Sequence, residues 1–149
     1  MSRVPELIDA LVGAFRAAPG LAGVEVTDGP QVTDSAAADW LLVGFDGSPD
    51  GESPAASTTQ SWADMSTRRG EQIALTMALV ASRGDTDVRA ARVRVYEMHA
   101  VVEALFRANP SLGLRTLQVA VGSSQLHQEQ TQSGVQARLL LTLACDTLA

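Results

Sequence analysis

The chain has 149 residues and a formal net charge of −6, with 17 acidic residues against 11 arginines and no lysine. This length suits one domain with its own core, so we expect residues 1–149 to form a single domain. The acidic balance argues against a domain that grips nucleic acid, because such domains normally carry a basic stripe. It is compatible with DNA passing nearby, because a negative surface repels phosphates.

Cysteine, histidine and hydropathy patterns exclude further classes of protein. Cys145 is the single cysteine, so no disulfide can form within the chain. One cysteine and two histidines far apart in sequence do not make a zinc site, and we expect no metal and no other cofactor. No apolar run approaches the ~20 residues of a membrane span. The N-terminus lacks the basic patch and apolar core of a secretory signal peptide, so we expect neither a signal nor a membrane partner.

Residues 4–17 are predicted to form a helix that packs on a sheet. Pro5 suits the first turn, where its missing N–H is harmless, and Pro19 and Gly20 end the helix. Apolar residues recur along it at spacings of four, three and four: Val4, Ile8, Leu11 and Phe15.

Two short strands are predicted next. Residues 23–28 place Val24 and Val26 on one face, and residues 40–45 form a continuous apolar run typical of a central strand covered on both faces. The polar, alanine-rich residues 31–39 between them give no clear signal.

Residues 46–57 have the composition of a flexible surface loop, with two prolines, two glycines and three acids. The first seven residues resemble the front half of a calcium loop, with Gly51 at the sharp turn. However, Ser57 stands where a closing glutamate is needed and Pro49 is out of place. We therefore expect a solvated loop and no calcium site.

Residues 58–65 are predicted to lead into or form a strand, and residues 71–82 a long one. In the second segment Ile73, Leu75, Met77 and Leu79 alternate strictly, which favours a strand over the competing helix.

Residues 85–109 are predicted to form the main helix, capped by Asp85 or Thr86 and ended by Pro110 and Gly113. One face carries apolar residues at spacings of three and four: Val88, Ala91, Val95, Met98, Val102 and Leu105. This pattern indicates a helix facing the core.

Residues 114–122 and 135–144 are predicted to be strands, separated by a polar arm, residues 123–133. Hairpin connections usually run two to five residues. Either the strands therefore extend past the sheet body or the arm reaches outward as a loop. The whole pattern predicts an α+β domain, with a mixed, mostly antiparallel sheet of roughly five strands and two helices packed on it.

The best candidates for function are neutral glutamines of the arm, whose amides both donate and accept hydrogen bonds. They suit polar contacts with another subunit. Arg68 and Arg69, which adjoin a strand, could bind a phosphate or a neighbour's carboxylate, although adjacent strand residues point to opposite faces. The candidate interface residues are Arg68, Arg69, Gln125, Gln128, Glu129, Gln130 and Thr131.

Catalysis is not expected. His99 lies on the main helix and His127 in the arm, and neither adjoins a Gly-x-Ser-x-Gly turn, a motif that the chain lacks. The absence of lysine excludes a Walker A loop and Schiff-base chemistry, and no Gly-x-Gly-x-x-Gly occurs. We therefore assign no catalytic residue.

Residues 126–138 (LHQEQTQSGVQAR), which run into a final apolar strand, resemble the C-terminal signature of tail terminator proteins from long-tailed (siphovirus-type) phages of actinobacteria. The helix opening at residues 84–89 (GDTDVR) is similar to theirs, as are residues 60–63 (QSWA) followed by the arginine pair. The resemblance covers most of the chain in order and is thin over residues 24–57. The final strand departs from the family because it is leucine-rich and lacks aromatics.

The resemblance implies a virion protein of the tail or neck, assembled in the host cytoplasm. Tail terminators form a hexameric ring that caps the tail tube, stops its polymerisation and presents a surface to the head connector, while DNA passes through the lumen. The expected partners are five further copies of the chain, the tail tube protein and the connector or stopper protein.

Three alternatives remain open at the level of sequence. A head–tail stopper or connector shares the size and ring habit, and a strand-rich, helix-poor structure would favour it. A small hydrolase or ligand-binding α+β domain would show a well-formed pocket with convergent polar groups. A regulatory protein that dimerises through a sheet edge is the third.

Overall fold

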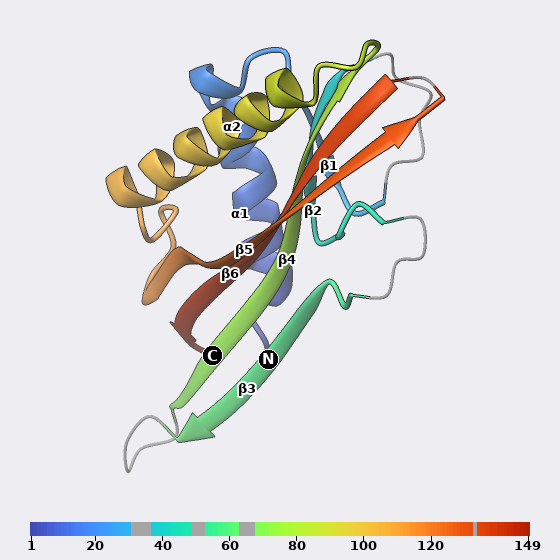
Figure 1. Ribbon diagram of the computed structural model, residues 1–149. Helices are drawn as coiled ribbons and strands as arrows, with labels where there is room; N and C mark the ends of the chain where they lie inside the picture. Colours follow the sequence, from blue (N-terminus) through green and yellow to red (C-terminus); the bar gives the residue numbers. More distant parts are fainter. Residues whose placement is uncertain (31–36, 49–52, 63–67, 133) are drawn as a thin grey trace.

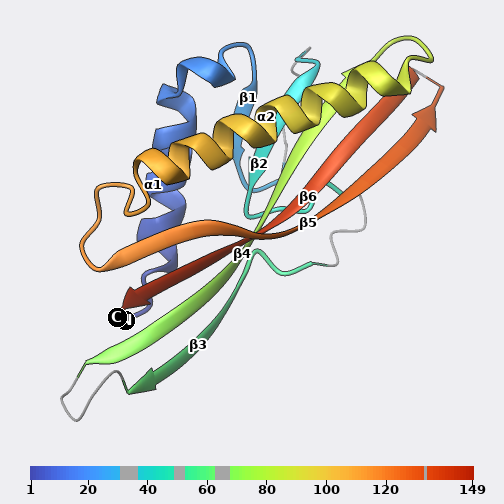
Figure 2. The same ribbon diagram turned by 60° about the vertical axis from the view of Figure 1, so that its left-hand side comes forward.

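The computed structural model describes residues 1–30, 37–48, 53–62, 68–132 and 134–149, and shows an α+β chain (Figure 1). A mixed six-stranded sheet, which is not closed into a barrel, carries two α-helices on one face (Figures 1 and 2). This architecture confirms the predicted fold class, apart from the ring, which a single chain does not display.

The elements follow one another in the order α1 (Val4–Ala17), a short 3-10 helix η1 (Pro19–Leu21), β1 (Glu25–Asp28), β2 (Asp39–Val43), β3 (Ala56–Trp62), β4 (Arg69–Arg83), α2 (Val88–Ala108), β5 (Leu117–Thr131) and β6 (Gly134–Leu148). The strand order is β1-β2-β4-β6-β5, and among the described strands only the β1–β2 pair is parallel.

Strand β3 also pairs with β4. It lies along the same edge of β4 as β2, but pairs with an earlier part of that strand. The half of β4 that begins at Arg69 pairs with β3, and the half from Met77 to Ala81 pairs with β2. The sheet therefore narrows to four strands, β3-β4-β6-β5, at the end that carries the chain termini. There β3 and the neighbouring end of β4 protrude past the body of the molecule (Figures 1 and 2).

The main core lies between the two helices and the sheet. Helix α1 has the predicted bounds and buries Leu7, Leu11, Val12 and Phe15, while Val4 and Ile8 pack at the margin. The rings of Phe15 and Phe106 lie 6.1 Å apart at a tilted angle, which joins α1 to α2.

A smaller apolar cluster lies on the other face of the sheet, where Trp40 and Leu42 of β2 meet Ala78 and Val80 of β4. Leu41 and Val43 face the main core. Strand β2 is therefore buried on both faces, which confirms the prediction from its continuous apolar run.

Of the two alternatives left open for the polar arm, extended strands and an outward loop, the structure shows extended strands over residues 123–131. Strand β5 continues to Thr131 and stays paired with β6, with Gln125 opposite Leu140 and Thr131 opposite Gly134. This polar segment has little intrinsic preference for a strand. Its pairing with β6 and the packing of α2 over this end of the sheet keep it in the strand conformation.

Gly134 makes the return from β5 to β6 possible. Its φ is +125°, and a Cβ atom here would lie 1.9 Å from the carbonyl oxygen of Arg83. Only glycine fits both constraints.

Other boundaries needed correction. Asp87, rather than Asp85 or Thr86, caps α2, because its carboxylate accepts from Ala90 N at 3.0 Å. Phe106 takes the buried position that Leu105 was expected to hold. The predicted loop 46–57 ends early, since β3 begins at Ala56, and residues 49–52 lie outside the described residues.

Candidate functional site

Strand β3 is an edge strand without the usual protection. Six of its seven residues are exposed, and among the described residues β4 is its only strand partner. It contains no proline and no charged residue, which are the devices that normally prevent edge strands from pairing with other chains. The free edge of β3 is therefore a candidate surface for association with another chain.

The end of the β3–β4 hairpin carries an exposed aromatic–cation pair. Trp62 is 65% exposed and stands opposite Arg69 in the strand register. The guanidinium carbon of Arg69 lies 5.1 Å from the centre of a Trp62 ring, within the range of a cation–π contact. Arg69 thus belongs to an exposed surface feature, and Arg68 is exposed beside it.

The glutamines of β5 divide between the two faces of the sheet. Gln125 and Glu129 share the face without helices, and Gln128 and Gln130 lie on the helix side. All four side chains are exposed. Gln128 is engaged within the chain, because its Oε1 accepts from Arg92 Nη1 at 2.9 Å.

Thr131 ends β5, and its side chain lies outside the described residues. The remaining candidates form two groups rather than one site. Strand β6 gives the distance between the two groups. Gly70, the neighbour of Arg69 in β4, lies opposite Leu148 of β6, whereas Gln125 of β5 lies opposite Leu140 of β6. The eight positions between Leu140 and Leu148 correspond to about 26 Å along a strand at roughly 3.3 Å per residue.

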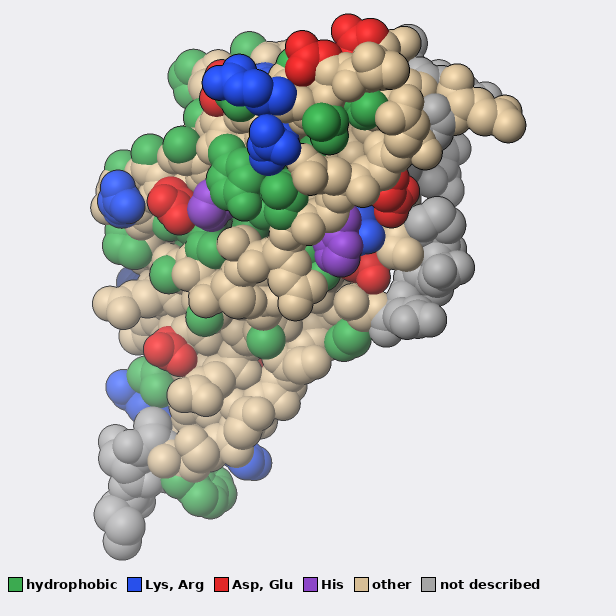
Figure 3. All heavy atoms as spheres, viewed as in Figure 1, with side chains coloured by type: hydrophobic (Ala, Val, Ile, Leu, Met, Phe, Trp, Pro, Cys, Tyr) green, Lys and Arg blue, Asp and Glu red, His purple; other side chains and the backbone are tan. Residues whose placement is uncertain are grey.

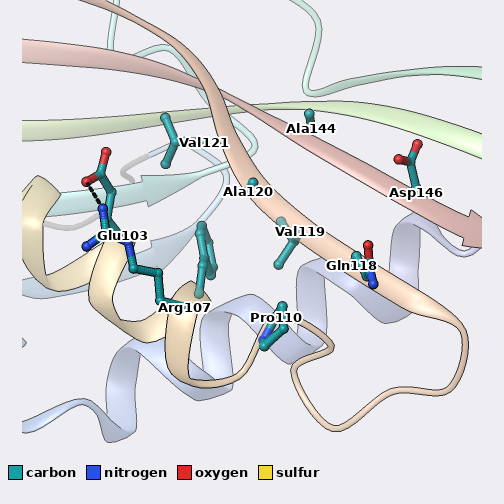
Figure 4. Close-up of a pocket in the computed structure, with 10 residues that line it drawn as sticks. Glu103, Arg107, Pro110, Gln118, Val119, Ala120, Val121, Ala144 and Asp146 are labelled. Carbon is teal, nitrogen blue, oxygen red and sulfur yellow. Dashed lines mark ion pairs between the residues drawn. The ribbon is translucent and has the colours of Figure 1, made fainter.

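A groove that the sequence did not reveal lies between the end of α2 and the first part of β5 (Figure 4). We call it the α2–β5 groove; its volume is about 520 Å³. Phe106 and Val119 line it as buried apolar side chains, and Val121 is half-buried. The charged groups around it are Glu103, Arg107 and Asp146.

The groove escaped prediction because its two sides come from elements distant in sequence. Val119 and Val121 have the alternation of an ordinary core-facing strand, and Phe106 that of a core-facing helix. Only the crossing of α2 over the sheet brings them together. No local pattern in the sequence signals that crossing.

The half-buried carboxylate of Asp39 serves the fold. Asp39 accepts from Arg94 Nε at 2.8 Å and from Arg83 Nη1 at 2.9 Å. Burial pushes the pKa of Asp39 upward, but the two arginines more than offset this effect and hold it below its usual value. The carboxylate therefore stays ionised and ties β2 to the end of β4 and to α2.

The side chains that could in principle serve catalysis or metal binding, Cys145, His99 and Asp46, are buried or make contacts within their own element or loop. Burial raises the pKa of the Cys145 thiol to about 11, so the reactive thiolate is scarce at neutral pH. His99 Nε2 lies 3.2 Å from Glu103 Oε1, one helical turn away. Asp46 accepts from the backbone N–H groups of Ser48 and Ser53, which closes its loop locally.

The described ranges contain no cluster of three or more histidine, cysteine or acidic residues that could hold a metal ion. Within the same ranges, neither helix combines the length and apolar character needed to cross a membrane.

No protein-family model matches this chain, and the comparison with curated proteins gives no match.

Proposed function

We propose that this chain is a tail terminator: a structural virion protein whose hexameric ring caps the tail tube, stops its polymerisation and joins the tail to the head connector. The observation that carries the proposal is the open sheet, whose outer strands on its two sides are unlike. The uncharged edge of β3 lies on one side, and the 15-residue β5 lies on the other.

Unlike edges on opposite sides of a subunit favour head-to-tail contacts. Such contacts close into a ring when the rotation between subunits divides a full turn, and otherwise produce filaments. A capping ring must present one face that fits the tube and another that does not, so that no further tube ring can be added. The resemblance of residues 126–138 to tail terminators supports the same reading.

The negative net charge of the chain is compatible with a position beside DNA but not with tight binding of DNA. The net charge is −6, and the chain has no lysine. In Figure 3 the lower half of the molecule, toward the β3–β4 hairpin, is covered mainly by uncharged side chains. A surface with few cations releases few counterions and binds phosphates weakly, which allows DNA to slide past.

The stopper or connector alternative loses its expected support, because α2 is a 21-residue helix rather than part of a helix-poor structure.

The enzyme alternative would need convergent polar groups and an activated nucleophile. The α2–β5 groove contains Glu103, Arg107 and Asp146, but the buried Cys145 thiol is protonated at neutral pH.

The proposal is tested by adding the purified chain to tail tube protein that is polymerising in solution. We expect tubes to stop growing and to carry a ring at one end in electron micrographs. Unchanged tube growth, with the protein remaining free in solution, would contradict the proposal.

A further inference from the structure

The hydrogen bonds of β4 show which backbone groups of β3 are used within the chain. Thr76 donates from its N–H to the carbonyl oxygen of Ala55 at 2.9 Å and accepts from the N–H of Gly44 at 2.8 Å, so its backbone faces the edge where β2 and β3 lie. Along an antiparallel strand such residues alternate with residues that face the other neighbour. The even-numbered residues of β4 therefore bond to β3, and the β3 residues opposite them are Ser57, Thr59 and Ser61.

The remaining residues of β3 direct their backbone N–H and C=O groups away from β4. They are Ala56, Thr58, Gln60 and Trp62. Among the described residues no strand pairs with this side of β3, and the hairpin protrudes past the body of the molecule (Figure 1). The seven residues of β3 correspond to about 23 Å of open edge at roughly 3.3 Å per residue. An open edge of this kind is a template for a further strand.

The side chains of β3 are complementary to those of a second β3 that runs antiparallel to it. One register pairs all seven residues, with Thr59 opposite Thr59 of the second copy. Ser57 then faces Ser61, and Thr58 faces Gln60, so hydroxyl and amide groups meet across the strands. No position of β3 carries a charge, so the pairing brings no like charges together.

The same register matches the largest side chain of β3 with the smallest. Trp62, which is 65% exposed, lies opposite Ala56 of the second copy. Ala56 is half-buried and packs at the margin of the main core. The indole therefore meets a small side chain and does not obstruct the pairing of the two strands.

A symmetric pair of β3 strands also closes the edge on both copies. An isologous contact uses the same surface twice, whereas unlike edges that meet without closing build filaments. The other outer strand, β5, is less open over its first part, because the N–H of Val119 already donates to the carbonyl oxygen of Pro110 at 2.9 Å. The best-matched partner for the β3 edge is therefore a second β3.

We propose that in the free chain the β3 edge of one copy pairs antiparallel with the β3 edge of a second copy, with Thr59 on the two-fold axis. The inference goes beyond the proposed function and does not depend on it, because it concerns the chain before assembly. A ring that uses the β3 edge would have to open this pairing. A contact limited to one strand per copy is small, so the dimer is weak and reversible.

Thr59→Cys tests the register directly. A residue on the two-fold axis faces its own copy, at a non-hydrogen-bonded pair whose Cα atoms lie about 4.5 Å apart, within the range of a disulfide. We expect mild oxidation to convert this variant to a disulfide-linked dimer, seen by non-reducing electrophoresis. Wild-type protein gives the background, because the side chain of its single cysteine, Cys145, is only 2% exposed.

Ser57→Cys and Ser61→Cys are the matched controls, because both residues are exposed and lie on the same face as Thr59. In the proposed register position 57 of one copy faces position 61 of the other. Two copies of either variant therefore hold their thiols about 13 Å apart, at roughly 3.3 Å per residue. Each variant alone should remain uncross-linked, and an equimolar mixture of the two should give the mixed dimer.

Thr58→Pro tests the backbone pairing without a cysteine. It removes an outward N–H and leaves the hydrogen bonds to β4 in place, since proline is tolerated in edge strands at such positions. We expect sedimentation velocity to show dimerisation at least about tenfold weaker than in wild type, because the symmetric dimer loses the bond twice. Thr58→Val keeps the N–H and should dimerise like wild type. Circular dichroism of each variant verifies the fold.

Two outcomes would overturn the inference. One is a wild-type chain that stays monomeric at every concentration. The other is cross-linking of Ser57→Cys alone as efficient as that of Thr59→Cys, which would indicate a different register or random collision. Both results leave the proposed function to be decided by tube growth. Cross-linking confined to Thr59→Cys, in a chain that does not stop tubes from growing, would support the dimer and reject the terminator role.

Discussion

The backbone N–H of Arg3 donates a 2.8 Å hydrogen bond to Oε1 of Glu71, a carboxylate that is only 1% exposed. The other oxygen of Glu71 accepts from Gln60 Nε2 at 3.0 Å. The guanidinium of Arg3 also donates to Thr147 Oγ1 at 2.8 Å. These contacts tie the start of α1 to β3, β4 and β6, where the chain termini lie together (Figure 2).

Glu71 should make stability depend on pH. Burial tends to raise the pKa of Glu71, but hydrogen bonds from Arg3, Ser2 and Gln60 more than offset this and hold it below the usual 4.5. A lowered pKa in the folded state gives stability that is present above pH 4.5 and is lost as pH falls through the folded-state pKa.

Glu71→Gln keeps the shape of the side chain and removes its charge. We expect the free energy of unfolding at pH 7 to fall by about 1–3 kcal/mol, because hydrogen bonds to a charged acceptor weaken. Urea titrations at neutral and acid pH measure the effect. If the variant lost as much stability on acidification as wild type, Glu71 would not be the group responsible.

Asp39 should behave similarly at the other end of β4. Asp39→Asn removes the charge that Arg83 and Arg94 neutralise, and we expect a loss of about 1–3 kcal/mol at pH 7. The pKa of Asp39 is lowered, so this stability is also present above its unfolded pKa and lost on acidification. Asp28→Asn, at an exposed position of β1, is the control in chemical unfolding. Equal stability of the two variants would contradict the assignment.

Two glycines allow a paired test of backbone constraints. Gly134→Ala places a Cβ atom against the Arg83 carbonyl at a φ of +125°, and we expect a loss of about 2 kcal/mol or more. Gly13→Ala in α1 meets no atom within 4 Å, and should stabilise the helix by up to about 1 kcal/mol. Thermal melting of both variants gives the comparison, and a destabilising Gly13→Ala would contradict the environment described for α1.

Cys145 should resist thiol reagents in the folded protein. Its side chain is 2% exposed, and its pKa is raised to about 11, so the neutral thiol persists throughout the range where ordinary cysteines ionise. We expect alkylation by iodoacetamide at pH 8 to be slow in buffer and rapid in denaturant. Rapid reaction of the native protein would show that β6 opens or that the thiol is accessible.

Local patterns were sufficient for the elements that local chemistry controls. The bounds of α1 follow from its apolar spacing, Pro5 and the Pro19–Gly20 stop, and the structure gives the same span. Strict alternation also identified β4, although Ala, Leu and Met favour helix. At the start of α2 three neighbouring residues could all act as caps, and only the hydrogen bond to Ala90 decides for Asp87.

The candidate site was less predictable, because tertiary contacts create it. Residues 123–131 have no apolar alternation, and pairing with β6 makes them a strand. Arg69 was identified as a surface group, but its stacking on Trp62 depends on the β3–β4 register. The α2–β5 groove depends on the packing of a helix against a strand, for which no single segment carries a signal.

We propose that this chain ends the polymerisation of a tail tube. Electron microscopy of particles assembled without the chain tests it most directly. We expect tail tubes that are over-long or ragged at the end nearest the head. Tails of normal length beside unattached heads would contradict it, and would mean that the chain joins the tail to the head without terminating the tube.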